Sequence, residues 1–201
     1  MESVKVNWTF EEAAQIAEHL KNDLKLDRIL LKVQKPGRYV GGEFNAIVKD
    51  WDSVRTRVAF VFPDIYDIGI SNVGLKILYD QVNQRDDSLA ERAYAPWTDM
   101  EEMMRANDIP LYALESKQPL ACFDLIGFTL PYETLYTNAL NILDLAGIPI
   151  RSADRDETHP IIIAGGHSTM NPCNAGIQPL VDRAMNSRFT WPRSIRMRAR
   201  P

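Results

Sequence analysis

The fold is decided by the stretch Arg57-Val-Ala-Phe-Val-Phe-Pro-Asp-Ile-Tyr-Asp-Ile-Gly-Ile-Ser-Asn-Val-Gly74. Its first part, Val58 to Phe62, is an apolar run with the length of a buried strand. Pro63 ends this run, an acidic loop follows, and a helix is expected to begin near Ser71, whose hydroxyl can cap it. Ligands of open parallel sheets bind outside the carboxyl ends of the strands, so this loop is the first candidate site.

Two later segments repeat the order of strand, turn and helix. Asp124 to Leu130 predicts a buried strand that Pro131 stops, and Pro160 to Gly166 predicts another that runs into a glycine turn. The helix between them is closed by Gly147 and Pro149. Strands that alternate with amphipathic helices predict a parallel sheet covered on both faces. The expected fold class is α/β, a doubly wound parallel sheet of the Rossmann-like or flavodoxin-like type.

The region after the first strand leaves one alternative open. A helical stripe is formed by Leu75, Leu78, Tyr79 and Val82. Either Leu89 to Ala95 or Leu111 to Leu114 then supplies the next strand of the sheet. A short helix is expected between these two segments, from Asp99 to Ala106, with Thr98 as its cap.

Residues 1–50 are expected to form an extension of helical and irregular structure. Thr9-Phe-Glu-Glu12 fits a capping box and predicts a helix that runs to about Leu20. Leu24 to Val33 suits either a short helix or an extended run. Lys35 to Glu43 is rich in glycine and predicts a turn leading into a strand from Phe44 to Val48, the alternative being a grip on an anion.

The chain changes character in residues 173–201. This tail has no aliphatic run of strand quality, and from residue 183 onward it has no acids but these arginines: Arg183, Arg188, Arg193, Arg196, Arg198 and Arg200. The composition predicts a disordered or non-native tail, and a sheet that is incomplete at its C-terminal end. An arginine-rich arm that attracts nucleic acid is the alternative.

Composition excludes several classes of protein. With 45% hydrophobic and 25% charged residues, the chain has the make-up of an ordinary soluble globular protein. A net charge of -4 argues against attraction of the whole molecule to nucleic acid or to an acidic membrane surface. No apolar run reaches the roughly 20 residues that span a bilayer, so a cytoplasmic protein is expected. Cys122 and Cys173 lie far apart and predict neither a metal site nor a disulfide framework.

Three loops are expected to meet at the carboxyl edge of the sheet: Pro63 to Gly69, Thr129 to Glu133, and Gly165 to Thr169. Gly165 and Gly166 would let the backbone approach a flat or phosphorylated ligand closely. His167, beside these glycines, is expected to contact the ligand or to hydrogen-bond within its loop.

Acids and aromatic residues accompany these glycines. An acidic cluster is predicted from Asp64, Asp67 and Glu133, the alternative being that these acids cap helices or face solvent. Tyr66 and Tyr132 would either stack on a ligand or fill the margin of the core.

Asp64-Ile-Tyr-Asp-Ile-Gly69 has the spacing of the D-x-H-x-x-G signature of cobalamin-binding domains, with Tyr66 where the histidine would be. Pro160-Ile-Ile-Ile-Ala-Gly-Gly-His-Ser-Thr169 resembles the glycine-rich strand end of cobalamin-binding-like domains in radical SAM proteins. The chain from about Leu30 to Pro172 is similar to the amino-terminal region of a radical SAM protein family. Three further segments carry this resemblance: Lys35-Pro-Gly-Arg-Tyr-Val-Gly-Gly-Glu43, Ala95-Pro-Trp-Thr-Asp-Met100 and Asn141-Ile-Leu-Asp-Leu-Ala-Gly-Ile-Pro149.

The resemblance implies a cobalamin-binding-like α/β domain over residues 51–172, placed ahead of a radical SAM barrel whose three cysteines hold a 4Fe-4S cluster that cleaves S-adenosylmethionine. This chain contains no C-x-x-x-C-x-x-C motif. It is therefore expected to be truncated before the barrel and to bind rather than to catalyse, the cluster and S-adenosylmethionine belonging to a full-length relative. The cofactor-binding residues that the resemblance implies are Asp64, Tyr66, Gly69, Thr129, Gly165, Gly166 and His167.

Tyr66 narrows the cobalamin hypothesis, because a phenol is a poor replacement for imidazole under cobalt. The residues favour cobalamin bound without a lower ligand, or no cobalamin. Two hypotheses of another class remain. One is a structural or partner-docking module that uses the helix from Thr9 to Leu20. The other is a receiver-like signalling domain, which would require an aspartate where this chain has Phe128-Thr-Leu-Pro131.

Overall fold

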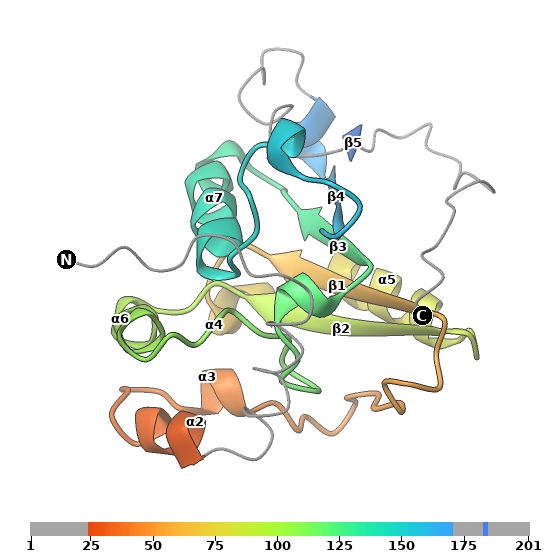
Figure 1. Ribbon diagram of the computed structural model, residues 1–201. Helices are drawn as coiled ribbons and strands as arrows, with labels where there is room; N and C mark the ends of the chain where they lie inside the picture. The colour runs from red at the N-terminus through yellow and green to blue at the C-terminus, as the bar shows by residue number, and fades with distance from the viewer. Residues whose placement is uncertain (1–23, 171–182, 185–201) are drawn as a thin grey trace.

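In a computed structural model, the chain forms a parallel sheet with the strand order β2-β1-β3-β4-β5 (Figure 1). The structure describes residues 24–170, 183 and 184. The strands are β1 (Thr56–Phe62), β2 (Ser88–Tyr94), β3 (Leu125–Thr129), β4 (Ile161–Gly165) and β5 (Arg183–Ala184). Each neighbouring pair is parallel. This is the flavodoxin-like order of a doubly wound sheet, so the expected fold class is confirmed.

Helices cover both faces of the sheet. The long helices are α5 (Val73–Asn83), α6 (Thr98–Ala106) and α7 (Tyr136–Leu145). The β1-α5-β2 and β2-α6-β3 connections cross the sheet in opposite directions, so right-handed crossovers place α5 on one face and α6 on the other (Figure 1). An ion pair of 2.8 Å between Arg105 and Asp144 joins α6 to α7. The shorter helices are α2 (Leu24–Leu30), α3 (Gly37–Val40), α4 (Tyr66–Gly69), η1 (Leu120–Cys122), η2 (Glu133–Leu135), η3 (Ser152–Asp154) and η4 (His167–Met170).

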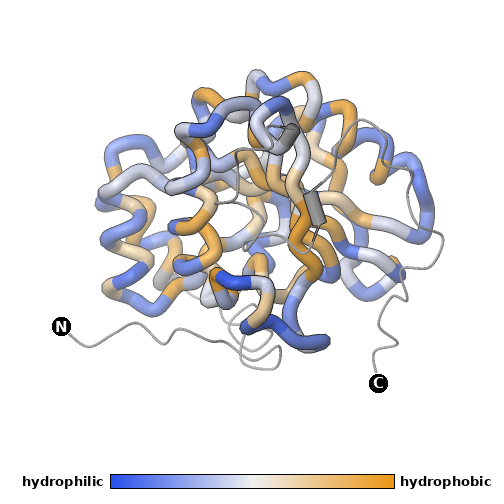
Figure 2. The backbone as a smooth tube through the Cα atoms, turned by 90° about the horizontal axis from the view of Figure 1, so that it is seen from above, coloured by the Kyte–Doolittle hydropathy of each residue, from blue (hydrophilic) through white to orange (hydrophobic). Residues whose placement is uncertain are grey.

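The core lies along the central strands, where the hydrophobic segments gather in Figure 2. Val61, Ile126 and Ile162 are fully buried, as expected for strands that have helices on both faces. Leu26 and Ile29 of α2 belong to the same core, and α2 contacts α6. No helix in residues 24–170 is long and apolar enough to cross a membrane.

The outer edge of β2 is covered by side chains and an irregular segment. The Asn83 amide accepts from the Ala90 N–H and donates to the Ala90 carbonyl, each at 3.0 Å. Lys49 donates to the Ser88 carbonyl at 2.7 Å. Lys49 is the last residue of a segment that runs along β2. We name this segment, residues 34–49, the strap. These contacts satisfy edge groups that would otherwise invite pairing with another chain.

Several local predictions are corrected. The strand expected from Phe44 to Val48 is not formed, because Tyr79 holds the Ile47 backbone at 2.6 Å and Phe44 is fully exposed. Asn72, not Ser71, caps α5, since its side chain accepts from the amide of Leu75 at 2.8 Å.

The structure also settles the segments for which the sequence allows two conformations. Leu24–Leu30 is helical, and β2 rather than Leu111 to Leu114 supplies the strand next to β1. Thr98 is the first residue of α6 and does not cap it. Arg183 and Ala184 pair with β4 although no strand is expected there from the sequence, because a short parallel pairing needs only backbone groups. The helix predicted from Thr9 to Leu20 and most of the tail lie outside the described residues.

Candidate functional site

The strand order reverses between β1 and β3, and a crevice at this point is the usual ligand site of such sheets. Two contacts cross the crevice. The Tyr132 hydroxyl donates to the Asp64 carboxylate at 3.4 Å, and the Asn138 amide donates to the Pro63 carbonyl at 2.8 Å. Asp64 and Tyr132 therefore meet as the sequence predicts, and Tyr132 stays 39% exposed.

The glycine turn after β4 lies beside this crevice. The Leu130 amide donates to the Gly165 carbonyl at 2.7 Å, and the buried Ser168 hydroxyl donates to the Leu130 carbonyl at 2.7 Å. Gly166 has a φ of +121°, and a Cβ there would lie 2.3 Å from the Leu130 oxygen, so only glycine fits. A Cβ on Gly165 would meet no atom within 4 Å. Space is therefore open at Gly165, and His167 next to it is exposed.

We name this region the open half of the site. It comprises Asp64, Thr129, Tyr132, Gly165, Gly166 and His167. Its members come from three loops at the carboxyl edge of the sheet, so the predicted convergence of these loops is found.

Tyr66 turns away from the open half toward β2 and the strap. Its hydroxyl donates to the Glu43 carboxylate at 2.8 Å, and its ring packs edge-on against Tyr94 at 5.3 Å between centroids. Burial, followed by the hydrogen bond to Glu43, raises the pKa of Tyr66 to about 12. Tyr66 is therefore a neutral phenol whose hydroxyl donates a hydrogen bond to a carboxylate.

Gly69 and Asp67 also serve packing and pairing within the protein. A Cβ on Gly69 would lie 2.5 Å from the Tyr94 ring and 3.0 Å from Phe62, so this glycine gives room to Tyr94. Asp67 accepts from Arg38 and, at 3.3 Å, from Lys35. The hydrogen bond from Arg38 holds the pKa of Asp67 below its ordinary value.

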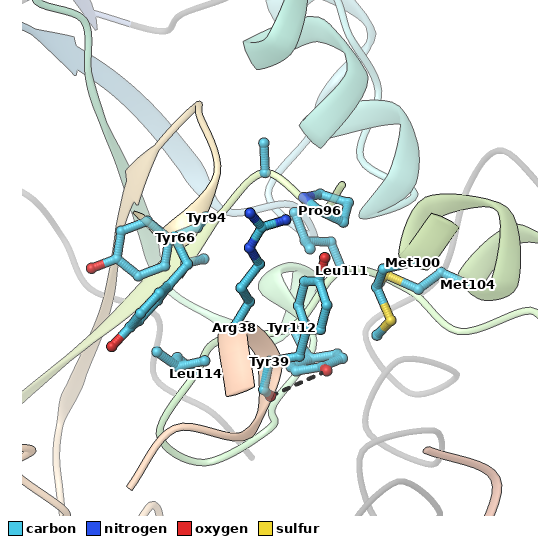
Figure 3. Close-up of a pocket in the computed structure, with 12 residues that line it drawn as sticks. Arg38, Tyr39, Tyr66, Tyr94, Pro96, Met100, Met104, Leu111, Tyr112 and Leu114 are labelled. Atoms are coloured by element: carbon cyan, nitrogen blue, oxygen red, sulfur yellow. Dashed lines mark hydrogen bonds between the residues drawn. The ribbon is translucent and has the colours of Figure 1, made fainter. Parts of the chain in front are cut away.

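We name this second region the closed half. Figure 3 shows the Arg38 guanidinium with Tyr66 and Tyr94 on one side and the methionines of α6 on the other. The cavity between them is about 20 Å³, room for about one water molecule. The Tyr94 hydroxyl is buried there without a hydrogen-bond partner in the described part of the chain. The strap therefore leaves no space for a cofactor on this side.

The residues behind the closed half were not predicted. Arg92 in β2 donates to Glu115 and to Glu43, both at 2.6 Å, and the Glu115 carboxylate also accepts from the Arg92 amide at 2.8 Å. Burial alone would lower the pKa of Arg92, but the charges of Glu115 and Glu43 outweigh it and raise the pKa. The signal in the sequence was Glu91-Arg92, two charges inside an otherwise apolar strand.

Two acids of the predicted cluster, Asp64 and Asp67, have separate partners. Among residues 24–170, 183 and 184, no group of three or more His, Cys, Asp or Glu side chains is placed to hold a metal ion. Asp64 caps the Ile65 amide at 2.8 Å, and Asp67 is paired with two cations of the strap. Separate partners thus keep these acids from acting together. Cys122 is buried in the core.

A comparison with known protein families finds a match. The model of the family described as radical SAM proteins, N-terminal, matches residues 74–185, more than half of the chain. This chain belongs to that family. It is thus an N-terminal region of a radical SAM protein. The match covers β2 to β5 with Gly165, Gly166 and His167, and begins after the loop that carries Asp64 and Tyr66. No curated protein matches the chain.

The two halves of this radical SAM N-terminal region differ in how they fit cobalamin. Tyr66 stands where the similar motif of cobalamin-binding domains has its cobalt ligand. Its hydroxyl stays protonated and donates a hydrogen bond to Glu43, so it offers cobalt no phenolate oxygen. In the open half, a Cβ on Gly165 would meet no atom within 4 Å, so another molecule could approach the backbone there. The hydrogen bond to Glu43 therefore argues against Tyr66 as a lower ligand, and the glycine turn is the part of the site that is left open.

Proposed function

We propose that this N-terminal region binds cobalamin at the open half, with no protein ligand to cobalt from the loop after β1. The observation that carries the proposal is the empty space beside Gly165, at the end of β4 and next to the crevice between β1 and β3 where the strand order reverses. Glycine at this position lets a flat ring lie against the backbone, where a side chain would hold it away. Cobalamin, when bound, would supply its cobalt chemistry to a partner domain.

The other residues of the open half would orient the ligand. Tyr132 is exposed and beside the crevice, so its ring can stack on a planar group. Asp64, which contacts Tyr132, and the exposed His167, which follows the glycine turn, can exchange hydrogen bonds with amide groups of the ligand periphery. Thr129 ends β3 next to Gly165, with which it pairs in register.

The proposed partner is a radical SAM barrel. Two cysteines cannot supply the three that hold a 4Fe-4S cluster, so cleavage of S-adenosylmethionine would occur on the barrel rather than on this chain. Exposed apolar side chains surround the carboxyl edge of the sheet, where Ile68 is 46% and Trp97 is 45% exposed. Their position after β1 and β2, at the carboxyl edge of the sheet, supports docking of the barrel at this edge, which would bring the cofactor to the substrate.

Titration of the purified chain with hydroxocobalamin, followed by visible absorbance, tests the proposal. We expect saturable binding, and at least tenfold weaker binding by a Gly165→Val variant, whose side chain would occupy the ligand space. The control is Gly37→Val in the strap, where a Cβ also meets no atom within 4 Å. No binding by the wild-type chain, or equal binding by Gly165→Val, would overturn the proposal.

A further inference from the structure

A hydrogen-bonded relay links the interior of the protein to the loop of the ligand site. Glu115 is 1% exposed in its side chain and pairs with Arg92, which is 7% exposed. Arg92 also donates to Glu43 of the strap, and Glu43 accepts from the Tyr66 hydroxyl. The distances along this path are 2.6, 2.6 and 2.8 Å. Each carboxylate thus has a charged donor, which makes these bonds stronger than neutral ones.

The relay ends on the segment that carries Asp64. Tyr66 is the first residue of α4, and the Ile70 amide donates to the Tyr66 carbonyl at 2.9 Å. The Ala95 amide donates to the carbonyl of Asp64 at 2.9 Å, which ties the start of the same loop to the end of β2. The loop between these points has few other apolar contacts, since Asp67 and Ile68 are exposed. Two side chains join this loop to the strap: Asp67, which pairs with Lys35 and Arg38, and Tyr66, which donates to Glu43.

We propose that Glu115, Arg92 and Glu43 are positioning residues, which fix the loop after β1 through Tyr66 and so hold Asp64 in place for the ligand. The inference rests on the proposed function, because it assigns these residues to the site at the open half. Under this proposal Tyr66, at the position of the cobalt ligand in the similar motif, has another role: it holds the loop after β1 to the strap, as the anchor of the loop. It also gives the strap a role in binding, since Glu43 is the strap residue that holds this anchor.

The chain offers a closely matched control for Glu43. Glu101 on α6 is 23% exposed in its side chain, against 24% for Glu43. Like Glu43, Glu101 accepts from an arginine and from one further side chain, Arg105 at 3.0 Å and Asn141 at 2.9 Å. It joins α6 to α7 and does not contact the loop. Glu43→Leu and Glu101→Leu therefore remove equivalent charges, one inside the relay and one outside it.

Two measurements that need no ligand test the relay. Ultraviolet titration of tyrosinate, with Tyr66 assigned by difference from a Tyr66→Phe variant, should show Tyr66 ionising at lower pH in Glu43→Leu and unchanged in Glu101→Leu. Amide hydrogen exchange at Ile68, Gly69 and Ile70 should be at least tenfold faster in Glu43→Leu alone. Glu43→Gln, whose amide oxygen still accepts from Tyr66, should fall between the wild type and Glu43→Leu.

The binding arm uses hydroxocobalamin on the same variants. We expect about tenfold weaker binding by Glu43→Leu, which corresponds to about 1.4 kcal/mol, and wild-type binding by Glu101→Leu. Unchanged titration of Tyr66 and unchanged exchange in Glu43→Leu would overturn the relay. Loop effects with equal binding by both variants would overturn its role in the site. A wild-type chain that binds no cobalamin refutes the proposed function instead, and the exchange and titration results still judge the relay.

Discussion

Gly165 and Gly69 are both among the predicted cofactor-binding residues, yet the space beside each is used in opposite ways. A Cβ on Gly165 would meet nothing within 4 Å, whereas a Cβ on Gly69 would lie 2.5 Å from the Tyr94 ring. The first glycine leaves space for another molecule, and the second leaves space for the protein itself. A motif glycine thus marks a close approach, and only the structure shows what approaches.

The same contrast separates the two halves of the site. In the closed half, the strap supplies a hydrogen-bond partner for Tyr66 and an ion-pair partner for Asp67, and β2 packs Tyr94 against the Tyr66 ring. In the open half, Tyr132 and His167 are exposed at the edge of the sheet. A ligand therefore has a surface to meet on the β3 and β4 side and a filled interior on the β2 side.

The largest effect is expected from valine at the two glycines. Gly69→Val should lower the free energy of unfolding by about 3 kcal/mol, because its side chain would overlap Tyr94 and Phe62 in a packed core. Gly165→Val should change it by less than about 0.5 kcal/mol, since its site is open and its φ is not left-handed. Urea unfolding of both variants measures the difference. Equal losses would show that the two halves are equally packed.

A second prediction concerns the pH dependence of stability that Glu91 of β2 causes. Glu91 is 2% exposed and accepts from the Ser116 hydroxyl at 2.6 Å. Burial raises the pKa of Glu91 from 4.5 to about 7. A raised carboxyl pKa means that the folded state binds the proton more tightly than the unfolded state does. The contribution of Glu91 to the free energy of unfolding is therefore greatest below pH 4.5 and is lost as the pH rises through about 7.

The variant Glu91→Gln removes this titration. Its advantage over the wild type should therefore grow between pH 4.5 and about 7, by about 3 kcal/mol, and stay constant above that range. Unfolding curves of both proteins at several pH values measure the difference between them, in which the other titrating groups cancel. A difference that does not depend on pH would show that Glu91 ionises normally.

The smallest effects are expected from the two tyrosine hydroxyls. Tyr66→Phe should cost about 1 kcal/mol, because it removes a 2.8 Å hydrogen bond to a half-buried carboxylate that stays paired with Arg92. Tyr132→Phe should cost less than about 0.5 kcal/mol, because its bond to Asp64 is 3.4 Å long and exposed. Thermal unfolding of the two variants compares them, and a larger loss for Tyr132→Phe would reverse the assignment of open and closed.

The central strands could be predicted because their residues are apolar without interruption. Val58 to Phe62 and Asp124 to Leu130 lie where helices cover both faces, so the pattern and the burial agree. β2 could not be distinguished from Leu111 to Leu114, because its Glu91 and Arg92 break the apolar pattern. The partners that make these charges acceptable, Ser116 and Glu115, come from a distant segment.

The strap was mispredicted for a similar reason. Phe44 to Val48 is mostly apolar, as a strand would be, but the Ile47 backbone is held by the Tyr79 hydroxyl, and the Lys49 side chain rather than a backbone group binds the Ser88 carbonyl of β2. At the site, the convergence of the three loops follows from the order of parallel strands and could be foreseen. The direction of Tyr66 could not, because it depends on Glu43, which reaches Tyr66 only through the fold of the strap.

Hydrogen exchange with and without excess hydroxocobalamin tests the central claim most directly, because it locates the ligand on one half of the site. We predict slower exchange on cobalamin binding at Leu130 and at Gly166 to Thr169, with no change along the strap at Arg38, Tyr39 and Ala46. Protection confined to the strap, with none in the glycine turn after β4, would contradict the claim.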